Sequence, residues 1–423
     1  MRNKYLARMM AIAATCIMTF PTATLAQKYV GGDISNLTDN EKKSPTYFDA
    51  SGNTISDPLE LFKAEQMNAM RVRLHVNPAD YPNNDPNVCQ DLEYVKALGK
   101  RIKDAGFKLM LDFHYSDTWA DPAKQWTPKQ WENLSDTELY EKIYDYTKDV
   151  LQQMKDAGAE PEFIQTGNEI SYGMLWGKEG SSNLKKCFMG NDANWDRFTT
   201  LLSQAGKACR EVCPLAKIIL HTERTTQPNV LTNFYDKIKI ANVDYDIIGL
   251  SYYPIWHNTL ATLETTLNTL EARYTDKDIM IVETGAAYSW LPDDKDYTPS
   301  YEASEAGQKQ FTDDLITMLN KHDKVTGLFW WWMDYNAYPQ ATTQMNADWW
   351  YAPLIDSNSG KPLAAMSSLK NFLNGSTGIR NTVSDNSNDE GQWFTISGQP
   401  AGQNPNKPGL YIRNGKKIIV GRK

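Results

Sequence analysis

Two glutamates of this chain have the residue type and the position that acid–base chemistry requires. Glu169 and Glu283 each end an apolar stretch of strand length, and a glycine lies beside each of them. Because the strands of a parallel sheet are buried on both faces, a carboxylate at such an end lies where the backbone leaves the core. Two carboxylates that meet across one cleft can protonate and attack a glycosidic bond. The pair therefore predicts a glycosidase.

Each glutamate also has a structural interpretation. Asn168 could cap a helix that carries Glu169 in its first turn, where the helix dipole favours a carboxylate. Glu283 could form a salt bridge at its strand end. In the functional interpretation, Asn168 hydrogen-bonds the sugar 2-OH beside the acid Glu169. Nearby donors such as Arg73 and a tyrosine hydroxyl then keep the nucleophile Glu283 ionised. The presence of two such glutamates favours this interpretation.

The segments that must position these residues alternate between strand-like and helical patterns from residue 29 to about residue 373. Strands are predicted at 29–34, 69–76, 107–114, 162–169, 217–222, 246–253, 278–283 and 326–332. Amphipathic helices are predicted at 92–105, 137–156, 195–212, 260–273, 306–321 and 363–372. Strand-then-helix units repeated in this way favour an α/β fold, a (β/α)8 TIM barrel. A doubly wound open sheet is the alternative, but no G-x-G-x-x-G motif follows the first strand.

Polar and aromatic residues gather after the predicted strands, where the active-site residues of such barrels lie. Aromatic faces stack on the C–H faces of sugars, so the tryptophans among them suit a polysaccharide cleft. Alternation along the last strand favours Trp330 and Trp332 for the interior and Trp331 for the helix-facing side. Arg73 and His114 could instead have structural roles. The residues expected to contact substrate are Arg73, His114, Asp117, Trp119, Asn168, Tyr253, Trp256, Trp330 and Trp350.

Both ends of the chain differ from the barrel in composition. Residues 1–26 combine a basic start, an apolar stretch too short to span a bilayer and a small-residue cleavage site, which indicates a signal peptide. We therefore expect export to the periplasm or the exterior, with a lipid anchor at Cys16 as the disfavoured alternative. Residues 27–374 form the predicted catalytic domain, 375–390 a polar linker, and 391–423 a small β-rich tail with a hairpin turn at Asn414-Gly415.

The formal net charge of −8 disfavours functions that depend on attraction to phosphate backbones or anionic lipid. A neutral substrate fits best, and we expect a monomer that binds no nucleic acid and does not span a membrane. The cysteines that remain after the expected cleavage permit two disulfides in any of three pairings: Cys89, Cys187, Cys209 and Cys213. Their spacing lacks the paired C-x-x-C pattern of a zinc site.

Several motifs of the chain resemble those of glycoside hydrolase family 53, the endo-β-1,4-galactanases. The longest is the run 111–122 after the third strand, which reads Leu-Asp-Phe-His-Tyr-Ser-Asp-Thr-Trp-Ala-Asp-Pro. Blocks at 165–170, 249–254 and 282–284 follow in the order of the family, and those at 31–34 and 71–73 also fit. The resemblance covers roughly residues 29 to 373, and its motifs are long and specific.

The resemblance implies retaining endo-hydrolysis of β-1,4-galactan, the neutral side chain of pectin and type I arabinogalactan. It also implies that Glu169, on the fourth strand, is the proton donor and that Glu283, on the seventh, is the nucleophile. Retaining chemistry requires the two carboxyl groups to lie about 5–5.5 Å apart. One alternative is a related β-glycanase that acts on another glycan such as mannan, but the motif at 112–122 argues against it. The other is a non-catalytic glycan-binding protein, which has no need for paired carboxylates.

Some bacterial members of the family bind calcium in the loop after the seventh strand through closely spaced Asp, His and Asn. The corresponding loop here, residues 288–296, contains aspartates but neither His nor Asn. No cofactor is therefore expected, and calcium in this loop is the alternative.

Overall fold

The computed structural model of the chain describes residues 27–81, 85–188, 193–336, 338–339, 351–376, 393–395, 401, 409–413 and 416–420. The predicted signal peptide, most of the predicted linker and Trp350 lie outside these residues, so they stay predictions. Within the described part of the chain, no helix is both long enough and apolar enough to cross a membrane.

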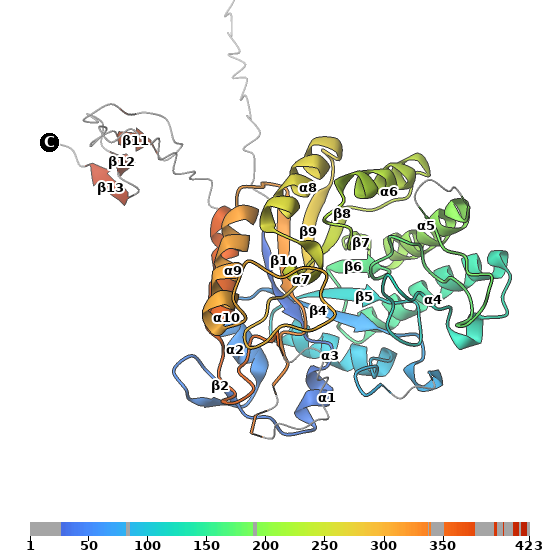
Figure 1. Cartoon of the computed structure of the whole chain (residues 1–423), viewed down its shortest axis with the longest axis horizontal. Helices are drawn as coiled ribbons and strands as arrows, with labels where there is room; N and C mark the ends of the chain where they lie inside the picture. The colour runs from blue at the N-terminus through green and yellow to red at the C-terminus, as the bar shows by residue number, and fades with distance from the viewer. Residues whose placement is uncertain are drawn as a thin grey trace, which may run out of the picture.

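Eight parallel strands close into a barrel with helices around its outside (Figure 1). They are β1 (Tyr29–Asp33), β4 (Ala69–Leu74), β5 (Lys108–Phe113), β6 (Phe163–Thr166), β7 (Lys217–Thr222), β8 (Ile247–Tyr252), β9 (Asp278–Thr284) and β10 (Val325–Trp330). Because β1 pairs with both β4 and β10, the sheet has no free edge. The predicted TIM barrel and its eight strands are confirmed, and no strand end differs from the prediction by more than three residues.

Helices return the chain from the end of each strand to the start of the next. The main ones are α3 (Leu92–Asp104), α4 (Asp136–Asp156), α5 (Trp195–Val212), α6 (Pro228–Ile240), α8 (Leu260–Arg273), α9 (Glu305–Leu319) and α10 (Ala364–Ser368). Side-chain caps fix several of their starts. In α4, Ser135 Oγ accepts the Glu138 backbone N–H while the Glu138 carboxylate accepts the Ser135 N–H, which satisfies two donors that the helix leaves unpaired.

Shorter elements decorate the barrel. They are α1 (Leu37–Glu41), α2 (Pro58–Ala64), α7 (Pro254–His257), the 3-10 segments η1 (Pro78–Asp80), η2 (Lys129–Trp131) and η4 (Leu369–Ser376), and the hairpin of β2 (Tyr47–Phe48) and β3 (Thr54–Ile55). The predicted helix at 363–372 is thus α10 continued by η4.

The inside of the barrel has an apolar floor followed by a polar layer. The floor consists of Ala69, Met110, Phe163, Ile219, Ile247, Met280, Val282 and Phe329. Side chains alternate between the two faces of a strand, so the residue two positions further on points the same way. On four strands that residue is polar or charged and fully buried: Arg71, Asp112, Gln165 and His221. The alternation of side chains along the strands therefore places a polar layer above the apolar floor, nearer to the C-terminal ends of the strands.

The C-terminal residues form an antiparallel sheet of their own. Strand β11 (Trp393–Thr395) pairs with β12 (Gly409–Arg413), which pairs with β13 (Lys416–Val420). The predicted hairpin is therefore confirmed, as is the β-rich character of the tail.

The four cysteines that the sequence offered for disulfides are all free thiols: Cys89, Cys187, Cys209 and Cys213. Burial raises the pKa of each of them, because a thiolate is poorly solvated inside the protein. These thiols are therefore poor nucleophiles and serve as packing groups.

Candidate active site

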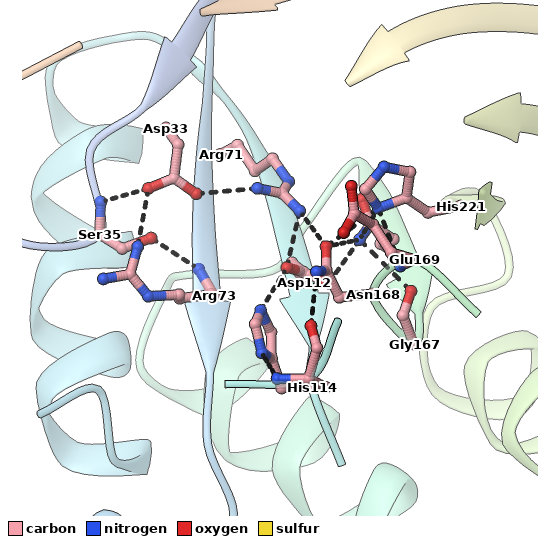
Figure 2. A network of polar contacts seen from close by, with 12 residues as sticks. Asp33, Ser35, Arg71, Arg73, Asp112, His114, Gly167, Asn168, Glu169 and His221 are labelled. Atoms are coloured by element: carbon pink, nitrogen blue, oxygen red, sulfur yellow. Dashed lines mark hydrogen bonds and ion pairs between the residues drawn. The ribbon is translucent and has the colours of Figure 1, made fainter. Parts of the chain in front are cut away.

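A buried arginine organises the polar layer. Arg71 Nη1 pairs with Asp33 at 3.0 Å, and Nη2 pairs with Asp112 at 2.8 Å. Nη2 also lies 2.9 Å from Glu283 and donates to Asn168 Oδ1 at 2.9 Å, so Arg71 joins groups from four other strands or strand ends. Figure 2 shows its contacts with Asp33, Asp112 and Asn168. Burial alone would lower the pKa of Arg71, but the charges of the three carboxylates raise it and keep the guanidinium ionised.

Glu283 points into the barrel because β9 contains a bulge. Ile281 packs in the outer core against the helices, and Val282 belongs to the inner floor. Strict alternation would therefore turn Glu283 outward. Instead β8 pairs Leu250 with Ile281 and then Ser251 with Glu283, which skips one residue of β9. The extra residue re-aims the glutamate toward the interior.

Both oxygens of the Glu283 carboxylate have partners in the barrel. Oε1 pairs with Arg71 at 2.9 Å, and Oε2 accepts the hydroxyl hydrogen of Tyr253 at 2.9 Å. Burial raises the pKa of Glu283 to about 7, and the charge of Asp112 adds to this. The Arg71 charge and the Tyr253 hydrogen bond oppose the rise, because both stabilise the carboxylate.

Glu169 follows β6 on a strained turn. Its backbone φ is 47°, in the left-handed region, two residues after Gly167 at 101°. Non-glycine residues seldom adopt this conformation, which persists at functional sites when the surroundings enforce it. Here the Gln125 side chain holds the turn by donating to the Asn168 carbonyl at 2.7 Å. The turn directs the carboxyl group toward Ser251, whose Oγ donates to Oε1 at 2.6 Å.

The pKa of Glu169 is raised well above its usual range. Enclosure of the carboxyl by protein is the main cause, followed by the charges of Glu283 and Glu223, while the Ser251 hydrogen bond opposes them. Part of the side chain still faces the open cleft, so a proton on it can reach a bound ligand. His221 Nε2 lies 2.7 Å from Ser251 Oγ, and burial with the nearby guanidinium lowers the His221 pKa, which keeps this ring neutral.

The carboxyl groups of Glu169 and Glu283 lie close together. Three atoms lie within 4.8 Å of one another: one carboxyl oxygen of Glu169, one of Glu283 and one ring nitrogen of His221. Carboxyl groups about 5–5.5 Å apart are typical of retaining glycosidases, whereas about 6.5–9.5 Å leaves room for the water of an inverting one. The separation between the Glu169 and Glu283 oxygens is therefore closer to that of retaining enzymes than to that of inverting ones.

The same three side chains are the only group of potential metal ligands of this size among the described residues. The aspartates of the loop after β9, at 293, 294 and 296, are not part of this group. The expectation that no cofactor is needed, with calcium in this loop as the alternative, stays a prediction. A cation between the two glutamates would also face the Arg71 guanidinium, which lies 2.9 Å from Glu283.

A cleft of about 710 Å³ opens at the C-terminal ends of the strands and includes both glutamates. Its aromatic lining is Trp119, Tyr253, Trp256, Tyr297 and Trp331, and its carboxylates are Asp121, Glu169, Glu223, Glu283, Asp294 and Asp296. Rings that stack on sugar faces and carboxylates that accept hydroxyl hydrogens suit a polyhydroxylated ligand. Of the residues predicted to contact substrate, Trp119, Asn168, Tyr253 and Trp256 lie in this lining.

Arg73 does not reach the cleft, which corrects its prediction as a substrate contact. It is fully buried, pairs with Asp33 at 3.3 Å and donates to the Asn87 carbonyl at 3.1 Å. Its guanidinium lies 4.2 Å from the Trp119 ring. Arg73 therefore contacts the Trp119 ring through a cation–π interaction and helps to hold it in place. The donor that the sequence analysis assigned to Arg73 beside Glu283 is Arg71 instead.

His114 and Asp117 are likewise buried supports and not substrate contacts. His114 Nδ1 accepts the Ala120 backbone N–H at 3.0 Å, and its Nε2 lies 3.1 Å from an Asp112 oxygen. Asp117 accepts two backbone N–H groups, from Asn77 at 3.0 Å and Lys129 at 2.8 Å. Both side chains fix the loop that follows β5, which corrects their predicted role.

Trp330 faces the helices, and Trp331 faces the cleft. Trp330 is fully buried, its Nε1 donates to the Ala352 carbonyl at 2.9 Å, and its ring packs against Phe311 of α9. Phe329 belongs to the barrel floor, so alternation places Trp331 on the inner face. The predicted sides of Trp330 and Trp331 were therefore reversed.

Comparison with known proteins agrees with this geometry. The sequence matches the model of Glycosyl hydrolase family 53 over residues 29–369, from β1 into η4. The chain belongs to this family. The match ends before the β-rich tail, which therefore lies outside the family domain.

Individual relatives cover the same region. An uncharacterized protein of Niallia circulans is 38% identical over 315 residues, which are 72% of this chain and 82% of that protein. The arabinogalactan endo-beta-1,4-galactanase of Cellvibrio japonicus is 34% identical over 348 residues, 78% of this chain and 86% of that enzyme. The solved catalytic domain of the family 53 member from Ignisphaera aggregans is 32% identical, with a TM-score of 0.70 over 84% of this chain and 98% of that domain.

Proposed function

We propose that the protein is an exported endo-β-1,4-galactanase that cleaves galactan with retention of anomeric configuration. The observation that carries the mechanism is the approach of the Glu169 and Glu283 carboxyl groups to within 4.8 Å. The substrate is supported by the family and by the name of the Cellvibrio japonicus relative. The aromatic cleft suits a neutral polysaccharide.

The reaction begins with Glu283 ionised and Glu169 protonated. Glu283 attacks the anomeric carbon and forms a galactosyl-enzyme ester, while the glycosidic bond breaks and the departing oxygen takes the proton of Glu169. Glu169 then removes a proton from a water molecule, whose oxygen attacks the anomeric carbon and releases Glu283. The two inversions restore the original configuration.

The electrostatics of the pair support this division of roles. Arg71 and Tyr253 favour the charged form of Glu283, whereas the charge of Glu283 favours the protonated form of Glu169. In the ester intermediate, Glu283 has no charge and this effect disappears. The pKa of Glu169 then falls, so after giving up its proton it can act as a base. It takes a proton from the attacking water and is protonated again at the end of the cycle.

Hydrolysis of linear β-1,4-galactan, followed by NMR and chromatography, tests the proposal. We expect new reducing ends in internal fragments, with the β-anomer appearing first and the α-anomer only through mutarotation. Initial α-product would contradict retention. Products from β-1,4-mannan but not from galactan would favour the clan-related β-glycanase, and binding of galactan without new reducing ends would favour a glycan-binding protein.

Replacing Tyr253 by phenylalanine tests the support of the nucleophile. Loss of the hydroxyl removes a hydrogen bond that favours the Glu283 carboxylate, so the pKa of Glu283 rises and the acidic limb of the kcat/KM profile moves to higher pH. We expect kcat to fall on the order of 10- to 100-fold. The matched control is Tyr144→Phe on the outside of α4, where the lost partner is the exposed Glu211. An unchanged acidic limb in Tyr253→Phe would contradict this role.

A further inference from the structure

A third carboxyl group of the cleft has no part in the reaction described above. Glu223 directly follows β7 and lines the cleft, although only 7% of its surface is exposed. Its Oε1 accepts the hydroxyl hydrogen of Ser171 and lies 3.2 Å from Arg224 Nε. Its Oε2 is buried and has no hydrogen-bond partner among the described residues. Such an orphaned acceptor is unfavourable unless a ligand or a water molecule supplies the missing donor.

The surroundings of Glu223 hold its carboxyl group in one orientation. Ser171 comes from the segment after β6, and Arg224 stacks over the Tyr172 ring of that segment at 4.5 Å. The charged groups around it are Arg224, Asp121 and Glu169. Burial raises the pKa of Glu223 to about 7, and Ser171 opposes the rise. Both contacts hold Oε1, so Oε2 is the oxygen that still lacks a donor.

The strand order places Glu223 on the leaving-group side of the catalytic pair. In the closed barrel, β7 lies opposite β1, and the two strands beside β1 are β4 and β10. Arg71 of β4 contacts Glu283, and the Trp331 ring after β10 lies 5.5 Å from the Arg71 guanidinium. The sugar that Glu283 attacks therefore lies toward β4 and β10. The acid Glu169 follows β6, the neighbour of β7, so we infer that the departing sugar lies on the β7 side.

We propose that Glu223, oriented by Ser171 and Arg224, binds a hydroxyl group of the first sugar on the leaving-group side. Oε2 accepts the hydroxyl hydrogen, which satisfies the orphaned oxygen and positions the glycosidic oxygen near Glu169. The ligand class is a pyranoside unit of the β-linked chain. This inference rests on the proposed endo-glycanase function and adds a residue that selects for a sugar leaving group.

Two substrates separate this role from others. β-1,4-Galactotetraose can place sugars on both sides of the catalytic pair, whereas nitrophenyl β-1,4-galactobioside has a leaving group without a sugar. We expect Glu223→Ala to lower kcat/KM on the tetraose on the order of 10- to 100-fold, the effect of one hydrogen bond to a charged group. On the nitrophenyl substrate the change should stay within about two-fold. Glu223→Gln keeps an acceptor oxygen at the same place and should lose less on the tetraose.

The control is Glu264→Ala, an exposed glutamate on α8 that pairs with Lys321, and thermal unfolding checks that every variant is folded. Equal losses on both substrates would overturn the inference and indicate that Glu223 acts only through the fold. A loss on the tetraose that comes only from a basic limb of the kcat/KM profile moved to lower pH would overturn it too, because Glu223 would then act through the acidity of Glu169. No loss on either substrate would overturn it as well. If the wild-type protein fails to cleave galactan or the tetraose, the proposed function itself falls; if wild type cleaves both and the variant matches it, only the role of Glu223 falls.

Discussion

Replacing Glu283 by alanine is expected to lower kcat on linear β-1,4-galactan on the order of 10⁵-fold, as removal of a covalent nucleophile does in other enzymes. No other carboxylate can take over, because Glu169 is needed as the acid. The protein should remain folded, since Arg71 keeps its ion pairs with Asp33 and Asp112. Initial rates of reducing-end release and circular dichroism measure the two effects.

Azide distinguishes the two glutamates by the stereochemistry of the product. In Glu283→Ala, azide can enter the space left by the carboxylate and displace nitrophenolate from nitrophenyl β-1,4-galactobioside, which gives an α-galactosyl azide. In Glu169→Ala, the ester still forms with this activated substrate, and azide attacks it to give a β-galactosyl azide. Glu141→Ala, an exposed glutamate on α4, is the control and should behave like wild type. A β-azide from Glu283→Ala would reverse the two assignments, and full activity in that variant would contradict any catalytic role of Glu283.

The architecture of the protein could be predicted from its sequence because it depends on patterns repeated many times. Eight apolar stretches separated by amphipathic ones allow few arrangements, and a misjudged end in one of them does not change the fold. The position of the two glutamates followed for the same reason, since barrel strands all present their C-terminal ends to one face. Helix α6 and the short elements were not identified individually, but they do not alter the barrel.

The direction of individual side chains was harder to predict. Side chains alternate between the two faces of a strand, so a shift of one residue turns a side chain to the opposite face. Arg71 and Arg73 lie on the same face, but Arg71 is two residues closer to the floor and therefore meets Glu283. Trp330 and Trp331 could have been assigned correctly from Phe329, had its place in the floor been known. For Glu283, strict alternation from Val282 gives the wrong face, and only the bulge corrects it. The bulge depends on how β9 pairs with β8, and the sequence of β9 alone does not reveal this pairing.

Replacing Arg71 by methionine should have the largest effect on stability. The change removes the guanidinium that pairs directly with Asp112 and Glu283 inside the barrel, and buried carboxylates without a partner destabilise a fold by about 3–5 kcal/mol. The loss should depend on pH. Burial already raises the pKa of Asp112 to about 6 and that of Glu283 to about 7, and without Arg71 both rise further. A carboxyl whose folded-state pKa is raised above its unfolded value loses stability as the pH rises between the two values.

Urea unfolding of Arg71→Met should therefore show a small loss near pH 5, where both carboxyls are protonated in the folded variant, and the full loss near pH 8. Activity should also fall, because a neutral Glu283 cannot attack the anomeric carbon. The matched control is Arg101→Met, which removes a guanidinium from two carboxylates at the surface, Glu41 and Asp57. Its side chain is 31% exposed, so water screens the pairs and the loss should stay below about 1 kcal/mol. Equal losses in the two variants, or a loss in Arg71→Met that does not change with pH, would mean that the barrel tolerates its carboxylates without Arg71. The interior charge network would then be a consequence of the active site and not a support of the fold.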